Sequence, residues 1–140
     1  MAMQSHHSFT LLGLTITVRL RAEESGGVQS IIEEQLPPGK RSPPHAIRQD
    51  ATLYLLEGAI TLTRNGVSVP MQVGDAQFIA QGVTRNIMNT GTADARLLVI
   101  VTPGGYERFL EDLSAAGSRL TEEPRLAAEI ATRHGIELRA

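Results

Sequence analysis

The sequence predicts an all-β domain, a barrel or sandwich of short antiparallel strands, followed by one or two C-terminal α-helices. Three observations lead to this fold class. Several short stretches alternate apolar and polar side chains, which is the period of half-buried strands. The dipeptide Asn65-Gly66 joins two of these stretches, and the hydrophobic period changes from two to nearly four after Gly104-Gly105.

The first clear strand is Leu14–Leu20, in which apolar and polar side chains alternate strictly. Strict alternation favours a strand with one buried face. Turn residues such as Ser25-Gly26-Gly27 separate it from the next strand. Short strands at this spacing favour a sandwich or a barrel. The other expected strands cover residues 28–36, 59–64, 67–69, 76–79 and 96–101.

Residues 59–64 and 67–69 are expected to form a hairpin. Asn65 and Gly66 separate them, and both residue types tolerate the positive φ that a tight two-residue turn requires. This pair is the strongest short-range hairpin signal in the chain.

Two helices are expected after residue 105. Four apolar residues recur at i, i+3, i+4 and i+7, so we expect the first helix to pack this face on the outside of the sheet. They are Tyr106, Phe109, Leu110 and Leu113. A second helix is expected to begin near Thr121, whose hydroxyl can cap it, and to end at Gly135. We expect both helices to support the barrel without taking part in chemistry.

Composition limits the possible classes of protein. The chain has 140 residues, no cysteine and a formal charge of −2. The length suits one domain, and the absence of cysteine excludes disulfides and thiolate metal sites. No run of like charge suggests a nucleic-acid surface, and no stretch approaches the roughly 20 apolar residues of a membrane span. We therefore expect a soluble cytoplasmic protein with no nucleic-acid or membrane partner.

Two blocks of the sequence carry residues at a characteristic spacing. In the first block five residues separate Gly39 from His45, and twelve separate His45 from Gly58. In the second block the corresponding positions are Gly74, Ala80, Gly82, Arg85 and Asn89.

The order and spacing of these blocks resemble the two motifs of the small single-domain cupins, a family that includes quercetin-dioxygenase-like proteins. The resemblance covers roughly residues 28–113. It implies a double-stranded β-helix, the cupin jelly-roll barrel, for residues 11–103. Residues 1–10 are then expected to be a mobile N-terminus, and residues 104–140 a C-terminal helical extension.

The resemblance fails at the metal-binding positions. Where the family motifs have two histidines, a glutamate and a third histidine, this chain has His45, Ile47, Ala51 and Arg85. A divalent metal needs several donors to replace its hydration shell, and one imidazole cannot supply them. A guanidinium about 5 Å from a dication would add a repulsion of roughly 6 kcal/mol at an effective dielectric near 20. We therefore expect no metal and no cofactor at these positions.

The motif positions are expected to line an apolar cavity that binds a small molecule. The candidate ligand-binding residues are His45, Ile47, Ala51, Leu53 and Arg85. The motif register points Arg85 into the barrel, where its charge requires an internal carboxylate or an anionic ligand. Ligand anchoring, an internal salt bridge and escape to solvent remain open for Arg85. A structural histidine bonded to a backbone carbonyl is the simplest interpretation of His45.

Three functions are compatible with these residues. The favoured one is a metal-free barrel that binds a small organic acid through His45 and Arg85. The second is a metal-independent isomerase or epimerase in which His45 acts as the acid or base. The third is a dioxygenase-like enzyme with displaced metal ligands, such as Gln49 or Asp50.

The resemblance also implies a homodimer, because cupins of this size commonly pair through barrel edges and exchange N-terminal strands. The strict alternation of Leu14–Leu20 suits an edge strand that needs a partner.

Overall fold

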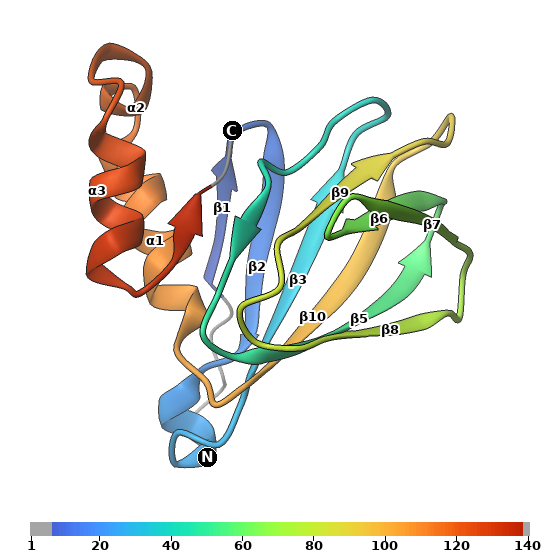
Figure 1. Cartoon of the computed structure of the whole chain (residues 1–140), viewed down its shortest axis with the longest axis horizontal. Helices are drawn as coiled ribbons and strands as arrows, with labels where there is room; N and C mark the ends of the chain where they lie inside the picture. The colour runs from blue at the N-terminus through green and yellow to red at the C-terminus, as the bar shows by residue number, and fades with distance from the viewer. Residues whose placement is uncertain (1–6, 139–140) are drawn as a thin grey trace.

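The computed structural model describes residues 7–138 and contains two antiparallel sheets that face each other (Figure 1). The larger sheet has six strands in the order β1-β2-β3-β10-β5-β8. Its strands are β1 His7–Leu11, β2 Leu14–Leu20, β3 Ser30–Leu36, β10 Ala95–Thr102, β5 Asp50–Glu57 and β8 Ala76–Ile79.

The smaller sheet has five strands in the order β11-β4-β9-β6-β7. Its strands are β11 Glu137–Leu138, β4 His45–Ala46, β9 Arg85–Asn89, β6 Ile60–Arg64 and β7 Val67–Met71. The chain passes between the two sheets several times, so some neighbouring strands, such as β3 and β10 or β4 and β9, come from distant parts of the sequence. The fold is an all-β jelly-roll barrel, as the sequence predicts.

Burial alternates along the strands as the sequence pattern predicts. In β3 every second residue is buried, beginning at Ser30, and in β10 every second residue is buried, beginning at Ala95. These inward residues meet those of the smaller sheet in one hydrophobic core. The core therefore fills the space between the two sheets.

The predicted hairpin is confirmed. Residues 60–64 pair with residues 67–71 in register, and Asn65 and Gly66 have φ values of 47° and 79°. A second two-residue hairpin joins β1 to β2 through Leu12 and Gly13, whose φ values are 52° and 83°.

The N-terminal part of the chain differs from the expectation. Residues 1–6 of the expected mobile segment lie outside the described residues, but His7–Leu11 form β1 and pair with β2. Strand β2 also pairs with β3, so it is an inner strand of the sheet. The interpretation of residues 14–20 as an edge strand was therefore wrong.

Three helices and one short 3-10 helix complete the described chain. They are η1 Ala22–Ser25, α1 Tyr106–Ala116, α2 Arg119–Glu122 and α3 Leu126–Arg133. The expected helix start at Thr121 is wrong, because this residue lies inside α2 and its hydroxyl donates to the Ser118 carbonyl oxygen. The predicted end near Gly135 is close to the observed end of α3.

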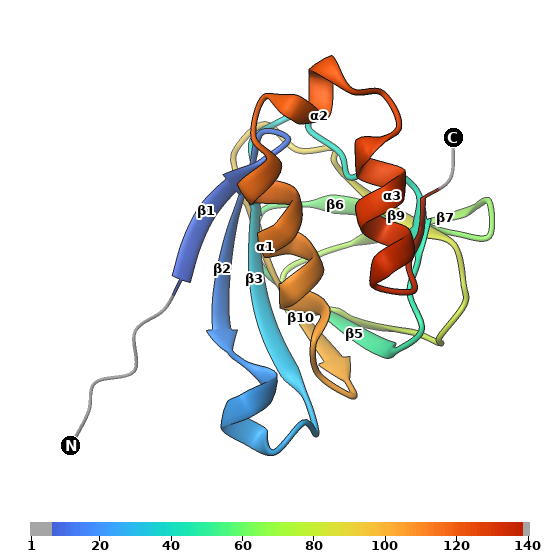
Figure 2. The same cartoon turned by 90° about the vertical axis from the view of Figure 1, so that its left-hand side faces the viewer.

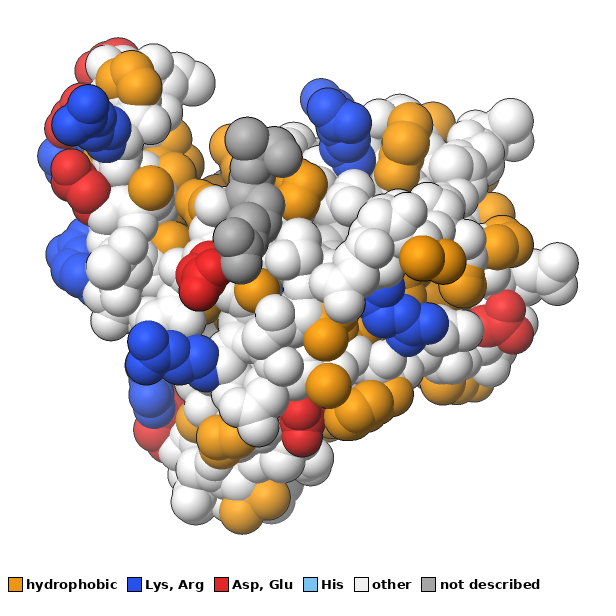
Figure 3. Space-filling view, in the orientation of Figure 1, with side chains coloured by type: hydrophobic (Ala, Val, Ile, Leu, Met, Phe, Trp, Pro, Cys, Tyr) orange, Lys and Arg blue, Asp and Glu red, His pale blue; other side chains and the backbone are white. Residues whose placement is uncertain are grey.

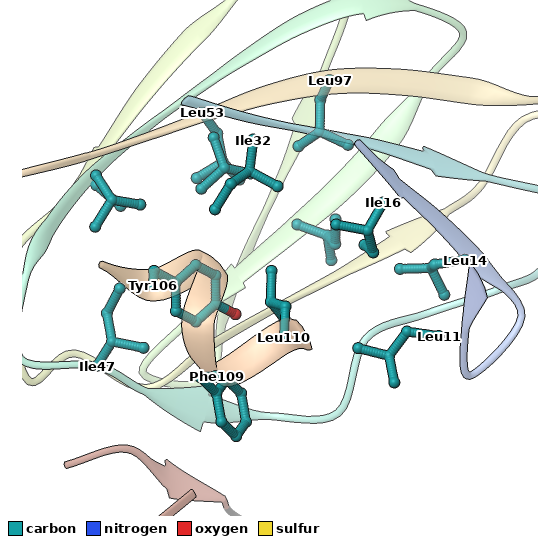
Figure 4. Packing of buried hydrophobic residues seen from close by; sticks show 14 of the residues in the cluster. Leu11, Leu14, Ile16, Ile32, Ile47, Leu53, Leu97, Tyr106, Phe109 and Leu110 are labelled. Atoms are coloured by element: carbon teal, nitrogen blue, oxygen red, sulfur yellow. The ribbon is translucent and has the colours of Figure 1, made fainter. Parts of the chain in front are cut away.

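Helix α1 packs on a different surface from the one expected. It contacts β1, β3 and α3, and α3 contacts β11, so the helices lie across the open side between the sheets (Figure 2). The predicted apolar face is correct, since all four of its residues are buried. Figure 4 shows Tyr106 and Leu110 of α1 on the side of the helix that faces the inward residues of the strands. Helix α1 therefore closes the barrel.

Charged side chains of both signs are interspersed on the face of the molecule that Figure 3 shows. Within residues 7–138, no helix has the length and hydrophobicity needed to span a bilayer.

Candidate functional site

Two strands of the smaller sheet bring His45 and Arg85 together. Strand β4 pairs with β9 so that these two residues are direct cross-strand partners. Both are buried, with exposed fractions of 9% and 5%. Two residues of different motifs therefore meet inside the barrel.

Hydrogen bonds fix the state of the His45 ring. Its Nδ1 lies 2.9 Å from the carbonyl oxygen of Pro43, which can only accept, so Nδ1 carries the proton. The other ring nitrogen, Nε2, is then an acceptor, and it lies 3.2 Å from the Nε donor of Arg85. Burial, followed by the charge of Arg85, lowers the pKa of His45 to about 4, against the opposing effect of the Pro43 hydrogen bond. His45 is neutral at pH 7.

Arg85 is held inside the barrel with an incomplete set of hydrogen bonds. Its Nε donates to His45, whereas Nη1 is buried and has no hydrogen-bond partner among the described residues. No carboxylate of the described chain lies within 4.0 Å of its guanidinium nitrogens. Within the part of the chain described, the Arg85 side chain therefore neither reaches solvent nor forms a direct salt bridge.

Glu34 is a buried carboxyl on the inner face of β3. Its neighbours across the sheet are Ile16 on β2 and Leu97 on β10, which offer no hydrogen bond from their side chains. Burial raises the pKa of Glu34 to about 7, and the charge of Arg85 acts in the opposite direction. The carboxyl is thus poised between its two protonation states near neutral pH.

Tyr106, the first residue of α1, completes the group. Its hydroxyl lies 3.2 Å from Nε2 of His45, and since that nitrogen is an acceptor the hydroxyl donates. The two rings are almost parallel, with an angle of 3° and centroids 6.3 Å apart. Burial is the main cause that raises the pKa of Tyr106, and the nearby Glu34 acts in the same direction. The tyrosine therefore stays protonated.

These four polar residues line one cavity of about 80 Å³. Its walls are otherwise largely hydrocarbon, supplied by both the strands and α1. The apolar lining includes Ile16, Leu53, Val99, Phe109, Leu110 and Leu113. An apolar space with a few convergent polar groups is the usual form of a small-molecule site.

The predicted site residues fall into two groups. His45, Leu53 and Arg85 line the cavity, as expected. Ile47 and Ala51 are fully buried in the core but are not part of the cavity lining. Both belong to the hydrophobic core between the two sheets.

Sequence reasoning missed Glu34 and Tyr106. The alternation of β3 carried a signal for the first, because a carboxylate at residue 34 shares the inward face with Ile32 and Leu36. Tyr106 was correctly placed on the apolar face of α1, but that face was expected to lie outside the sheet. Tyr106 lines the cavity, so α1 contributes a polar group to it as well as supporting the barrel.

Two other buried polar residues have structural roles. Asn89, the last position of the second motif, donates from Nδ2 to the carbonyl oxygens of Leu36 and Ala93 and accepts from the Gly91 amide. Glu107 accepts hydrogen bonds from the amides of Ala22 and Gly105. Both side chains brace loops and lie outside the cavity lining.

Comparison with known proteins places the chain in a family. Residues 32–101, half of the chain, match the model of the cupin domain, Cupin_2. The chain belongs to the cupin family. The resemblance seen in the two motifs is thereby confirmed.

This cupin is similar in sequence to a curated relative. Over 70 residues it is 31% identical to the tetracenomycin polyketide synthase protein TcmJ of Streptomyces glaucescens, which covers 49% of this chain. The match spans about half, 47%, of the length of that relative.

The structural likenesses show the fold. KdgF from Halomonas sp. superposes with a TM-score of 0.65 at 13% identity, covering 75% of this chain and 91% of KdgF. The polyketide cyclase RemF from Streptomyces resistomycificus gives 0.61 at 20% identity, covering 73% and 80%.

The metal-binding positions of this cupin do not fit a metal ion in the manner of the family motifs. Of the four positions, His45 alone offers a donor atom of the usual kind, and its Nε2 accepts hydrogen bonds from Arg85 and Tyr106. Among residues 7–138 no group of three or more His, Cys, Asp and Glu side chains is arranged to hold a metal. The displaced ligands considered from the sequence, Gln49 and Asp50, both lie outside the cavity lining, and Asp50 accepts a hydrogen bond from the Gln81 amide.

Proposed function

We propose that this cupin binds a small carboxylate-bearing molecule in its cavity and does so without a metal ion. The observation that carries the proposal is the buried Nη1 of Arg85, which has no partner among the described residues. A buried charged donor without a partner is unfavourable by several kcal/mol, so the site favours a bound anion.

The remaining groups suit an organic acid. Guanidinium and carboxylate form short charge-assisted hydrogen bonds, and the Nη1 donor is free to make one. His45 is held neutral, so it adds no second charge to the site. The hydrocarbon walls suit an aliphatic or aromatic group. A ligand with one carboxylate and a compact apolar body meets each of these conditions.

The test is a calorimetric titration of the full chain with butanoate and benzoate, each compared with the corresponding neutral amide. We expect the acids to bind the natural protein and the amides to bind at least tenfold more weakly. We expect Arg85→Met to abolish this preference. Arg64→Met is the matched control, because Arg64 is the cross-strand partner of Arg85 on β6 and bonds to Phe78 and Gln77 instead.

Folding of the two variants is checked by thermal melts. The proposal fails if neither acid binds the natural protein, or if Arg85→Met, folded like the control, binds the acids as well as the natural protein does.

The second candidate function is an enzyme that acts on a polyketide-like substrate. The specific observation in its favour is the 31% identity to a protein named as part of a polyketide synthase. His45 does not suit the role of acid in such a reaction, because its pKa of about 4 leaves no proton to donate at pH 7. Turnover of a polyketide substrate that depends on Arg85 would favour this candidate over simple binding.

We retain the homodimer as a proposal for assembly. Tyr54 and Phe78 are 39% and 58% exposed on neighbouring strands at one side of the larger sheet, which is a candidate apolar contact. Light scattering at micromolar concentration should give twice the chain mass, and a monomer would refute the proposal.

A further inference from the structure

Glu34 and Arg85 face each other across the barrel without forming an ion pair. Glu34 comes from β3 in the larger sheet and Arg85 from β9 in the smaller one, and both line the cavity. No carboxylate oxygen of Glu34 lies within 4.0 Å of the guanidinium nitrogens, although the two charges interact. The cavity thus offers a proton acceptor and a cation on separate walls.

Both groups also have atoms that can form further hydrogen bonds. The Glu34 carboxyl makes no hydrogen bond with any side chain or backbone group in residues 7–138 that the structure records. Nη1 of Arg85 is likewise without a partner there. A molecule between them can place an anionic oxygen on Arg85 and a hydrogen on Glu34 at the same time.

We propose that this cupin enolises a small 2-oxo acid without a metal, with Glu34 as the catalytic residue that removes the proton next to the carbonyl. The inference rests on the proposed function, because the carboxylate of the 2-oxo acid is the anion that Arg85 holds. It adds a reaction and a residue that binding alone does not require.

The proton transfer balances without any co-reactant. A carboxylate oxygen of Glu34 takes the proton from C3 of the 2-oxo acid, and the electron pair of the broken C–H bond forms the C2–C3 double bond. The carbonyl π pair moves onto the C2 oxygen, which becomes an enolate. Return of a proton from the Glu34 carboxylic acid to C3 restores the ketone, and exchange of that proton with water labels the carbon.

The surroundings favour this step. The enolate is stabilised by a positive charge already in place, the Arg85 guanidinium, which lines the same cavity as Glu34. The groups that face Glu34 are Arg85 on β9 and Tyr106 on α1, with His45 of β4 in the same lining. Its flanking residues on β2 and β10 are apolar. This environment keeps the pKa of Glu34 at about 7, where a general base works best at neutral pH.

The experiment follows hydrogen–deuterium exchange at C3 of 2-oxobutanoate by proton NMR. The full chain is used in D₂O with a metal chelator present. We expect the natural protein to accelerate exchange over buffer, with activity rising as pH increases through about 7. Glu34→Gln should slow the protein-dependent exchange by roughly 100-fold or more.

Glu33→Gln is the matched control, because Glu33 is the preceding residue of β3 and pairs with Arg19 and Arg96 away from the cavity. The Glu33→Gln variant should accelerate exchange at C3 of 2-oxobutanoate as much as the natural protein does. Melting curves show that each variant is folded, and broadening of the 2-oxobutanoate resonances reports binding in the same samples.

The outcomes separate the two proposals. If 2-oxobutanoate binds but exchanges no faster than in buffer, or if folded Glu34→Gln exchanges as fast as the natural protein, enolisation is overturned and acid binding stands. If butanoate binds and 2-oxobutanoate does not, the assignment of a 2-oxo acid is overturned. If neither acid binds, both proposals are overturned.

Discussion

Nε of Arg85 lies 3.2 Å from Nε2 of His45, so a guanidinium N–H is directed at the one ring nitrogen that could ligate a metal. The contact follows from the pairing of β4 with β9, which makes the two residues cross-strand partners. A positive charge and an engaged imidazole occupy the centre of the barrel. The chemistry we propose for this cupin therefore depends on Arg85 and Glu34.

Replacing Glu34 by Gln should remove a loss of stability that the natural protein shows as pH rises. The folded-state pKa is raised from 4.5 to about 7, so the favourable contribution is present below pH 4.5 and is lost as pH rises through 7. Between pH 4 and pH 8 the natural protein should lose on the order of 3 kcal/mol that Glu34→Gln does not lose. Denaturant unfolding at the two pH values measures this difference, and equal pH slopes in both proteins would contradict it.

Replacing His45 by Gln should remove a loss of stability that the natural protein shows as pH falls. The folded-state pKa is lowered from 6.5 to about 4, so stability is present above pH 6.5 and is lost as pH falls through 4. The natural protein should lose on the order of 3 kcal/mol over this range from His45 alone. Denaturant unfolding of Glu34→Gln and of the double variant with His45→Gln isolates the His45 contribution, and the double variant should lose less stability on acidification by that amount.

Gly58, the last glycine of the first motif, should be far less tolerant of substitution than Gly66. Both have positive φ, 80° and 79°. A Cβ at residue 58 would lie 2.8 Å from the Asp94 carbonyl oxygen and 2.9 Å from Cα of Ala95, whereas nothing lies within 4 Å at residue 66.

Gly66→Ala should therefore show mainly the left-handed backbone strain, about 1–2 kcal/mol. Gly58→Ala should lose about 1–3 kcal/mol more, because backbone atoms must move apart. Equal unfolding free energies for the two variants would show that the close approach to β10 is not what requires glycine.

Glu107→Ala should destabilise the junction between η1 and α1. The Glu107 carboxylate accepts from the amides of Ala22 at 2.8 Å and Gly105 at 3.2 Å, and its side chain is fully buried. Losing both acceptors leaves at least the Ala22 amide without a partner and should cost about 2–4 kcal/mol. Glu107→Gln keeps one acceptor oxygen and should cost less; unfolding free energies of the two variants compare them.

Much of the fold follows from the sequence. Leu14–Leu20 and Ala76–Ile79 are strands with the predicted bounds. In the first of them the alternation reflects one buried face, which carries Leu14, Ile16 and Val18. The strands β4 and β11 escape prediction, since two residues carry no period. The hairpin at Leu12 was also missed, because leucine is rarely found at the φ of 52° that this turn requires.

The site was only partly predictable. Motif spacing placed His45 and Arg85 at the cavity, but the contact between them depends on the pairing of β4 with β9, which the sequence did not show. An apolar helix face shows that a helix is buried but not against which surface, so Tyr106 was placed outside the sheet. Glu34 was missed because a single carboxylate in an alternating strand gives no sign of what it will face across the barrel.

The most direct test of the metal-free site is elemental analysis of the purified, untagged protein for Mn, Fe, Ni, Cu and Zn, together with the variant Arg85→His. The account predicts metal well below one equivalent per chain in the natural protein, because its donors are too few and Arg85 repels cations. Near-stoichiometric metal in the natural protein, lost when His45 is replaced by Gln, would contradict it.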